Sequence, residues 1–221
     1  MEEEKIEEQI EKEIEEKYFK RGLEWYLCLL IALIMALLTR YYIGTATIIR
    51  HDSMAPTLRD KQKVITSRIN RITKNEYEVG DIIVFEAPSE LKEPDTDIFE
   101  GEAIYNNEPK GLINKFVYYV LEFNKVSYIK RIIAVEGDYV RIMGNKVYVN
   151  GKLLEENYLP EGTETKGVYC NNIVVPKGHV YVLGDNRGES LDSRAFGCIP
   201  IEKIEGKVVF CYWPLSKFGG I

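Results

Sequence analysis

The stretch YIKRIIAVEGDYVRIMGNKVYVNG, residues 128–151, contains three short runs rich in Val, Ile and Tyr. Gly137–Asp138 separates the first run from the second, and Gly144–Asn145 separates the second from the third. Branched and aromatic residues favour strands, and two alternating runs joined by a Gly-Asn pair are typical of a tight hairpin. We therefore expect a strand over residues 128–136, followed by a hairpin of residues 139–144 and 146–151.

Runs of the same kind occur on both sides of this stretch. They occupy residues 63–69, 81–87, 171–176, 179–184 and 207–213. Their short length and their Gly, Asn or Pro boundaries predict a mainly β fold, an all-β domain of coiled antiparallel sheets. The regularity fails at about residues 86–127, which we interpret as an insertion of unknown structure. Its apolar part, GLINKFVYYVLEF, is compatible with a helix or a strand.

An uncharged run, WYLCLLIALIMALLT, lies at residues 25–39. With its flanks it approaches the ~20 residues that cross a bilayer as a helix, which predicts a transmembrane anchor over residues 23–43. Lys17, Lys20 and Arg21 precede it, and this positive charge favours a cytoplasmic amino terminus. A cleaved signal peptide, suggested by Gly44-Thr45-Ala46, and a buried core helix are the alternatives.

The anchor divides the chain into three parts. Residues 1–22 form a charged helical leader in the cytoplasm, residues 23–43 the anchor, and residues 44–221 an extracytoplasmic β domain. The net charge of −6 over 221 residues comes from acidic residues concentrated in residues 1–16, and the remainder is close to balanced, so we expect no nucleic-acid partner. Four cysteines include no CxxC, and we expect no metal site. Pairing among Cys170, Cys198 and Cys211 stays open.

Ser53, in HDSMAPTLRDKQKV, is a candidate nucleophile directly after the anchor. A serine hydroxyl needs an adjacent base to become nucleophilic. The sequence holds two histidines, His51 and His179, and a triad on His51 would still need a buried carboxylate. Lys130 is the other candidate base, because burial disfavours the charged form of a lysine and lowers its pKa. Taken alone, this segment favours a strand lysine that reaches solvent over a buried base.

The polar stretch VLGDNRGESLDSRAFGCIP, residues 182–200, is the third candidate segment. By itself it predicts a loop in which Asp185, Arg187, Asp192 and Arg194 make ordinary salt bridges. A hydroxyl such as that of Ser190 can also orient a neutral lysine without charging it.

Together, and in this order, the segments resemble bacterial type I signal peptidases, the membrane-anchored Ser-Lys proteases that remove signal peptides. The blocks that carry the resemblance are SMAPTL from Ser53, GDIIVF from Gly80, YIKR from Tyr128 and GDNRGESLDSRAFG from Gly184. With the anchor, they cover most of residues 25–213.

The resemblance implies a role for each matched residue. Ser53 is the acylated nucleophile, Lys130 the general base and Ser190 the group that orients the lysine. Supporting residues are Asp192 and Arg194 as an ion pair behind the site, Asp185 close to them, and Tyr128, which packs on the dyad. Ile49, Leu58 and Ile129 line shallow substrate pockets that accept small side chains. The Ser53 amide is one oxyanion donor, and His51 stands where the family has Ser or Gly, which leaves the second donor open.

The resemblance also implies a biological setting. The enzyme acts on exported preproteins after a small-x-small site, through an acyl-enzyme and without a cofactor, at the cell membrane as a single-pass monomer in the lipid bilayer. Two rivals remain: a soluble self-cleaving repressor of the Ser-Lys type, and an inactive anchored β domain that binds exported polypeptides. The anchor and the absence of a helix-turn-helix pattern disfavour the first, and the intact Ser53, Lys130 and Ser190 disfavour the second.

Overall fold

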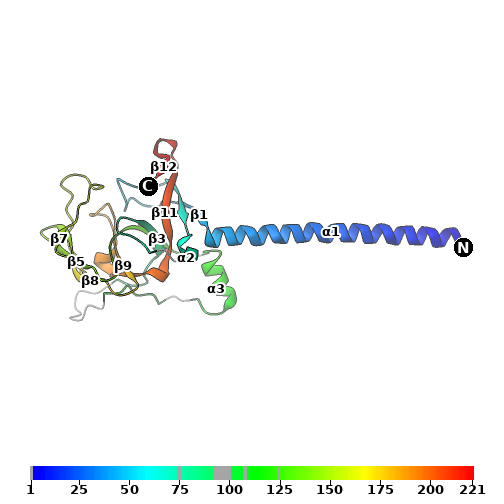
Figure 1. The fold of residues 1–221 in the computed structure, drawn as a ribbon, viewed down its shortest axis with the longest axis horizontal. Coiled ribbons are helices and arrows are strands. Elements are labelled where there is room, and N and C mark those ends of the chain that lie inside the picture. Colours follow the sequence, from blue (N-terminus) through cyan, green and yellow to red (C-terminus); the bar gives the residue numbers. More distant parts are fainter. Residues whose placement is uncertain (1, 74–75, 92–100, 107–108, 124) are drawn as a thin grey trace. The chain divides into compact units, whose positions relative to one another are not determined.

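The computed structural model describes residues 2–73, 76–91, 101–106, 109–123 and 125–221. These form two units, one ending at Tyr41 and one spanning Tyr42–Ile221 (Figure 1). The first unit consists of helix α1, Glu2–Tyr42. Its segment Lys12–Tyr42 has a mean hydropathy of 2.0 in its most apolar part and is long and apolar enough to cross a membrane. Among the described residues, one helix meets this criterion, as the apolar run predicted.

The second unit is built on a large antiparallel sheet of eight strands. Its central order is β1-β2-β11-β3-β4-β9-β10, and β12 pairs with β11. The strands are β1 Gly44–Ile48, β2 Lys63–Ser67, β3 Ile82–Glu86, β4 Ser127–Val135, β9 His179–Leu183, β10 Ile199–Pro200, β11 Ile204–Trp213 and β12 Gly219–Gly220. The mainly β prediction is therefore confirmed.

A second antiparallel sheet has four strands in the order β7-β6-β5-β8. They are β5 Tyr139–Met143, β6 Lys146–Val149, β7 Lys152–Leu153 and β8 Asn172–Val174. The predicted hairpin is confirmed, since Met143 pairs with Lys146 across a two-residue turn. Gly144 and Asn145 both have positive φ, 58° and 62°, as a type I′ turn requires.

Short helices connect the strands. They are α2 Asn70–Thr73, α3 Leu112–Tyr119 and α4 Ser193–Phe196, with 3-10 turns η1 Ile201–Lys203 and η2 Leu215–Lys217. Helix α3 decides the conformation that the sequence left open, because the apolar part of the insertion begins as a helix. Residues 92–100, 107–108 and 124 of the insertion lie outside the described residues.

Apolar side chains of the second unit form three clusters. One lies between the two sheets and contains Val140, Val147 and Tyr181, a second is centred on Phe85, Ile132 and Phe196, and a third gathers Ile49, Met54, Leu58 and Val84. Strand β4 contributes to all three clusters, which makes it the central element of the unit. The cysteines are free thiols, and Cys170, Cys198 and Cys211 are buried.

Candidate active site

Ser53 and Lys130 meet between the turn that follows β1 and the middle of β4. Lys130 pairs with Ile83 of β3 and projects its amine from the sheet toward the turn. Its Nζ donates a hydrogen bond of 2.8 Å to Ser53 Oγ. The two residues are separated by 77 positions in the sequence, so the sheet creates this contact rather than local structure.

The Lys130 side chain is nearly inaccessible to water, with 3% of the residue exposed. Desolvation lowers the pKa of its amine from 10.5 to about 8, while the negative charges of Asp192 and Asp185 raise it and Arg194 lowers it further. Nζ also lies 5.5 Å from the centre of the Tyr128 ring, which packs edge-to-face on Phe85. A lysine with this pKa is partly neutral near neutral pH, so it can accept a proton from a bonded hydroxyl.

Cleavage should depend on pH as the titration of Lys130 requires. Only the neutral amine can act as a base, so the rate should rise with pH to a midpoint near the Lys130 pKa of about 8 and level off above it. The measurement is kcat/KM for a peptide substrate between about pH 6 and about pH 10. A midpoint at the ordinary lysine value of 10.5, or a rate that does not change across this range, would contradict a lysine base.

Ser190 lies beside the dyad but does not bond Lys130 in this structure. Its Oγ is buried and, within the described part of the chain, has no hydrogen-bond partner. Gly184 explains the close approach, because a Cβ at this position would overlap both Ser190 Oγ and the carbonyl oxygen of Ser53. The unpaired hydroxyl is therefore available to a neighbouring donor or acceptor.

The segment Gly184-Asp185-Asn186-Arg187 holds the backbone around Ser53. The amide of Asn186 donates to the carbonyl oxygen of Ser53 at 3.1 Å, and its side-chain amide donates to that of Asp52 at 3.2 Å. Thr57 Oγ1 donates to Asp185 Oδ2 at 2.6 Å. The sequence did not single out Asn186 or Thr57, although both lie within the blocks that carry the resemblance.

Asp185 is bound on its other side by Arg131, the residue after Lys130. Arg131 Nε and Nη2 donate to the two carboxylate oxygens at 2.9 and 2.7 Å. The Arg131 guanidinium also stacks 4.0 Å from the centre of the Tyr158 ring. Such a bidentate pair fixes the planar groups of both residues. Through Asp185, strand β4 is therefore held against the turn that contains Ser53 and Thr57.

Asp192 and Arg194 form the expected ion pair behind the dyad. Arg194 Nε and Nη2 donate to the Asp192 carboxylate at 2.8 and 2.9 Å, and the Gly184 amide adds a third bond at 3.1 Å. Asp192 also caps α4, because its side chain accepts from the Arg194 amide. Both side chains are buried, so each charge depends on the other.

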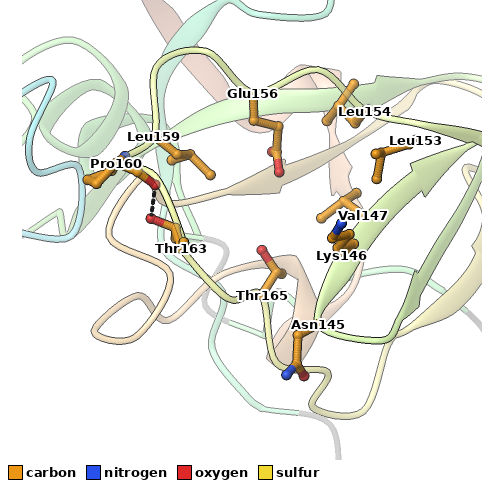
Figure 2. Close-up of a pocket in the computed structure, with 11 residues that line it drawn as sticks. Asn145, Lys146, Val147, Leu153, Leu154, Glu156, Leu159, Pro160, Thr163 and Thr165 are labelled. Carbon is orange, nitrogen blue, oxygen red and sulfur yellow. Dashed lines mark hydrogen bonds between the residues drawn. The ribbon is translucent and has the colours of Figure 1, made fainter.

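Arg187 connects the same segment to the loop after β7. Its side chain is fully buried, forms an ion pair with Glu156, and donates to Thr165 Oγ1 at 2.5 Å. Glu156 and Thr165 line a cavity of about 180 Å³ between this loop and the β5–β6 hairpin. Figure 2 shows the Glu156 carboxylate and the Thr165 hydroxyl turned toward each other there. The cavity contains none of the site residues predicted from the sequence.

The three predicted pocket residues share one apolar cluster, but they differ in exposure. Ile49 and Leu58 are 2% and 1% exposed, while Ile129 is half-buried at the edge of the same cluster. Of these three residues, Ile129 is therefore the one accessible to solvent in this structure, while Ile49 and Leu58 are buried in the cluster. A bulky side chain entering here would displace packed core atoms.

His51 is exposed and has a φ of 76°, an unusual value for a residue with a side chain. Its amide donates to Asp60 Oδ1 at 3.2 Å. The Ser53 amide, by contrast, has no acceptor within the described residues and can point toward an oxyanion. His179 lies at the start of β9, with Nε2 3.8 Å from Glu102, away from Ser53.

Replacing His51 by Gly tests its part in the oxyanion site. Gly adopts positive φ without strain, so the backbone should be kept while the ring is removed. We expect kcat to fall by less than about tenfold, because loss of a main oxyanion donor costs about 10²–10³. The measurement is kcat for a peptide substrate, with Arg59→Ala as the exposed neighbouring control. A loss of 10² or more would identify the ring as the second donor.

The described residues contain no group of three or more His, Cys, Asp or Glu side chains placed to hold a metal ion. The chemistry available at this site is that of a serine hydroxyl bonded to a buried amine. Such a pair can form and hydrolyse an acyl-enzyme.

Comparisons with known proteins agree with one another. The family model described as "Signal peptidase, peptidase S26" matches residues 22–213. Signal peptidase IB of Staphylococcus aureus strain Mu50 is 33% identical over 214 residues, which cover 90% of this chain and 93% of that protein. Thylakoidal processing peptidase 1 of Arabidopsis thaliana is 34% identical over 186 residues, or 84% of this chain. The match covers 47% of that longer protein.

A solved structure, that of a signal peptidase I from Enterococcus faecalis V583, is also similar, with a TM-score of 0.39 and 23% identity. The alignment covers 60% of this chain and 97% of that one. The family match spans the apolar part of α1 and nearly the whole second unit, which we call the catalytic unit from here on. The chain therefore belongs to the signal peptidase family of peptidase S26 and is a serine peptidase.

Proposed function

We propose that this protein is a membrane-anchored endopeptidase that removes signal peptides from exported preproteins by a Ser-Lys dyad. The observation that carries this proposal is the 2.8 Å hydrogen bond from Lys130 Nζ to Ser53 Oγ, made by an amine that is almost fully buried. Burial lowers the Lys130 pKa to about 8, so part of the amine is neutral near neutral pH, and the hydrogen bond gives this neutral form direct access to the hydroxyl proton.

In the proposed reaction, neutral Lys130 takes the Ser53 proton as Oγ attacks the scissile carbonyl carbon. The Ser53 amide stabilises the oxyanion, with His51 or a water as the second donor. The protonated amine then gives its proton to the leaving nitrogen, and the carbon–nitrogen bond breaks to leave an ester on Ser53. A water activated by the neutral amine hydrolyses this ester. Ser190 is proposed to orient the amine by turning its buried hydroxyl, which has no partner among the described residues, toward Lys130 Nζ. Tyr128 supports the dyad by packing.

The apolar cluster beside the dyad supports the proposed small-x-small specificity. Ile129 forms the exposed edge of a shallow surface, and Ile49 and Leu58 form its closely packed base. Substrate side chains of one or two carbons fit against such a surface, whereas larger ones would meet packed atoms.

The proposed topology follows the sequence divisions. Residues 1–22 form a cytoplasmic leader, residues 23–43 cross the membrane, and residues 44–221 act outside the cytoplasm, with the preprotein and the lipid bilayer as partners. The exposed apolar helix of Lys12–Tyr42 and the positive residues before the apolar run support this arrangement. The catalytic protein is proposed to be a monomer.

Mass measurement tests the proposed function directly. The full-length protein is incubated with a purified preprotein that has a small-x-small site, and the products and the Ser53-containing peptide are weighed. We expect one cut after the small residue and an acyl adduct on Ser53. Ser53→Ala should give neither product nor adduct. A cut at another site would contradict the specificity, and product formed by Ser53→Ala would contradict the nucleophile.

A further inference from the structure

Helix α3 is an apolar helix that the catalytic unit does not bury. Six of its eight residues are apolar or aromatic, yet none is buried. Leu112 is 88% and Ile113 is 79% exposed, the highest values among large apolar residues of the described catalytic unit. Phe116 on α3 is 46% exposed, and Phe123 after it is 66% exposed. A cluster of this kind on a folded protein indicates a contact surface.

The exposed residues share one side of α3. Leu112, Ile113 and Phe116 are spaced as neighbours on a helix surface, while Tyr118 faces the unit. Tyr118 donates to the carboxylate of Glu86 at 2.8 Å, and its ring lies 5.2 Å from Lys125 Nζ. The helix is thus held by its polar contacts to the sheet, with its apolar side turned outward.

Hydrogen bonds and ion pairs place α3 at one particular edge of the catalytic unit. Glu122, just after α3, forms an ion pair with Arg68. The backbone amide of Arg68 donates to the carbonyl oxygen of Ile43 at 2.9 Å. Ile43 is the residue between the end of α1 and the start of β1. Arg68 therefore contacts both Glu122, which follows α3, and Ile43, which follows α1. The end of α3 thus lies near the start of β1. In Figure 1, α3 lies beside α2, the helix that follows Arg68.

We propose that α3 lies in the membrane–water interface, with Leu112, Ile113 and Phe116 inserted among lipid acyl chains. The proposal rests on α1 spanning the bilayer, because Ile43 then lies at the lipid surface and α3 lies next to it. The exposed Lys110 and Lys115 on the same segment suit the headgroups of anionic lipids. The catalytic unit thereby has two membrane attachments, α1 and α3, which fix its orientation on the bilayer.

A fluorescent label at position 113 measures this insertion without depending on catalysis. The full-length Cys28→Ser protein, with Ile113→Cys carrying an environment-sensitive fluorophore, is reconstituted into vesicles of phosphatidylethanolamine and phosphatidylglycerol. Cys28 is exposed, whereas the other three thiols are buried and react slowly. Val174→Cys is the matched control, since Val174 is an apolar residue of β8 that is 58% exposed.

We expect lipid-borne nitroxides to quench the label at 113 and aqueous iodide to quench the label at 174. Iodide quenching at 113 equal to that at 174 would overturn the proposal. The label at 113 could instead be protected from iodide without being quenched by nitroxides. Loss of this protection as the lipid-to-protein ratio is raised would show contact with a second copy. Protection that requires residues 1–22 and persists without nitroxide quenching would show contact with the leader. Each of these results would overturn the lipid assignment.

An activity measurement then separates this proposal from the proposed function. Leu112→Ser with Ile113→Ser should cleave a soluble peptide at a rate within about twofold of the unchanged enzyme, because neither residue contacts the dyad. Cleavage of a preprotein embedded in vesicles should fall by about five- to tenfold, and Val174→Ser should change neither rate. If the double variant cleaved both substrates at the rates of the unchanged enzyme, the membrane role of α3 would be overturned and the Ser-Lys proposal would stay intact.

Discussion

Lys130→Met is expected to lower kcat by about 10³- to 10⁴-fold and to leave the protein folded. Methionine fills a similar volume without an amine, so Ser53 loses its proposed base, the amine that lies 2.8 Å from its hydroxyl. No other basic side chain within the described residues bonds Ser53 Oγ, which leaves no group to replace it. Single-turnover cleavage of a peptide, measured at several pH values, gives the acylation rate directly.

The stability of the same variant distinguishes lost chemistry from lost structure. The folded pKa of Lys130, about 8, lies below its ordinary value of 10.5, so the unfolded chain binds more protons between these pH values. Stability therefore rises with pH across this interval, and below it the buried charge costs on the order of 3 kcal/mol. Methionine removes that cost, so the variant should unfold at the same or a higher temperature at neutral pH.

The control for this experiment is Lys207→Met, on strand β11. Lys207 is 37% exposed and pairs with Asp81 at 2.5 Å, so its loss should change cleavage by less than about threefold. A Lys130→Met enzyme that retained more than a tenth of the activity would refute the lysine base. A variant that lost activity together with its folded structure would leave the loss to be explained by stability, and the thermal melt reports which of these occurs.

Most strands were predictable because the residues within each strand have a high propensity for extended conformation. β-Branched and aromatic runs placed β2, β3, β4, β5, β6, β8, β9 and β11, and Gly144–Asn145 placed the hairpin. Strand β1 follows the anchor as GTATI, a run with small residues and little periodicity, and it was not predicted. Its conformation depends on pairing with β2, which is a tertiary effect.

Helix α3 was ambiguous for a different physical reason. Sequence periodicity assigns apolar residues to a buried face, but Leu112, Ile113 and Phe116 of α3 are exposed. The helix is instead held by Tyr118 and by Glu122, polar groups whose partners Glu86 and Arg68 are distant in sequence. Such contacts cannot be inferred from a local pattern.

The residues of the candidate site were identified by the order of the motif blocks rather than by local pattern. Lys130 alone was compatible with a solvent-exposed strand lysine, and only the fold shows its burial and its bond to Ser53. Alternate residues of a strand share a face, and Lys130 Nζ accordingly lies 5.5 Å from the centre of the Tyr128 ring. The Arg187–Glu156 pair had no sequence signal, because it joins two loops that only the folded sheets bring together.

Asp192→Asn is expected to destabilise the protein by about 3–5 kcal/mol. The asparagine amide has one acceptor oxygen and no charge, so the buried Arg194 guanidinium loses both its bidentate partner and its counter-ion. The bond from the Gly184 amide and the cap of α4 depend on the same carboxylate. Urea unfolding at neutral pH measures the loss. Lys61→Met is the control, since its pair with Asp60 is 3.9 Å long and exposed, and it should change stability by less than about 0.5 kcal/mol.

The same substitution should also move the pH dependence of cleavage to lower pH. The Asp192 charge raises the pKa of Lys130 against the dominant effect of burial, so removing the charge lowers that pKa further below about 8. The acid limb of the rate profile should then move to lower pH, and the enzyme that stays folded should retain more of its maximal rate below neutrality.

A residue that only supported the structure would reduce the folded fraction and leave the midpoint of the profile unchanged. A midpoint that moved upward would show that Asp192 does not act on Lys130 through its charge. Kinetics measured well below the unfolding temperature therefore separate the two roles of this carboxylate, which pairs with the guanidinium of Arg194 and raises the pKa of Lys130.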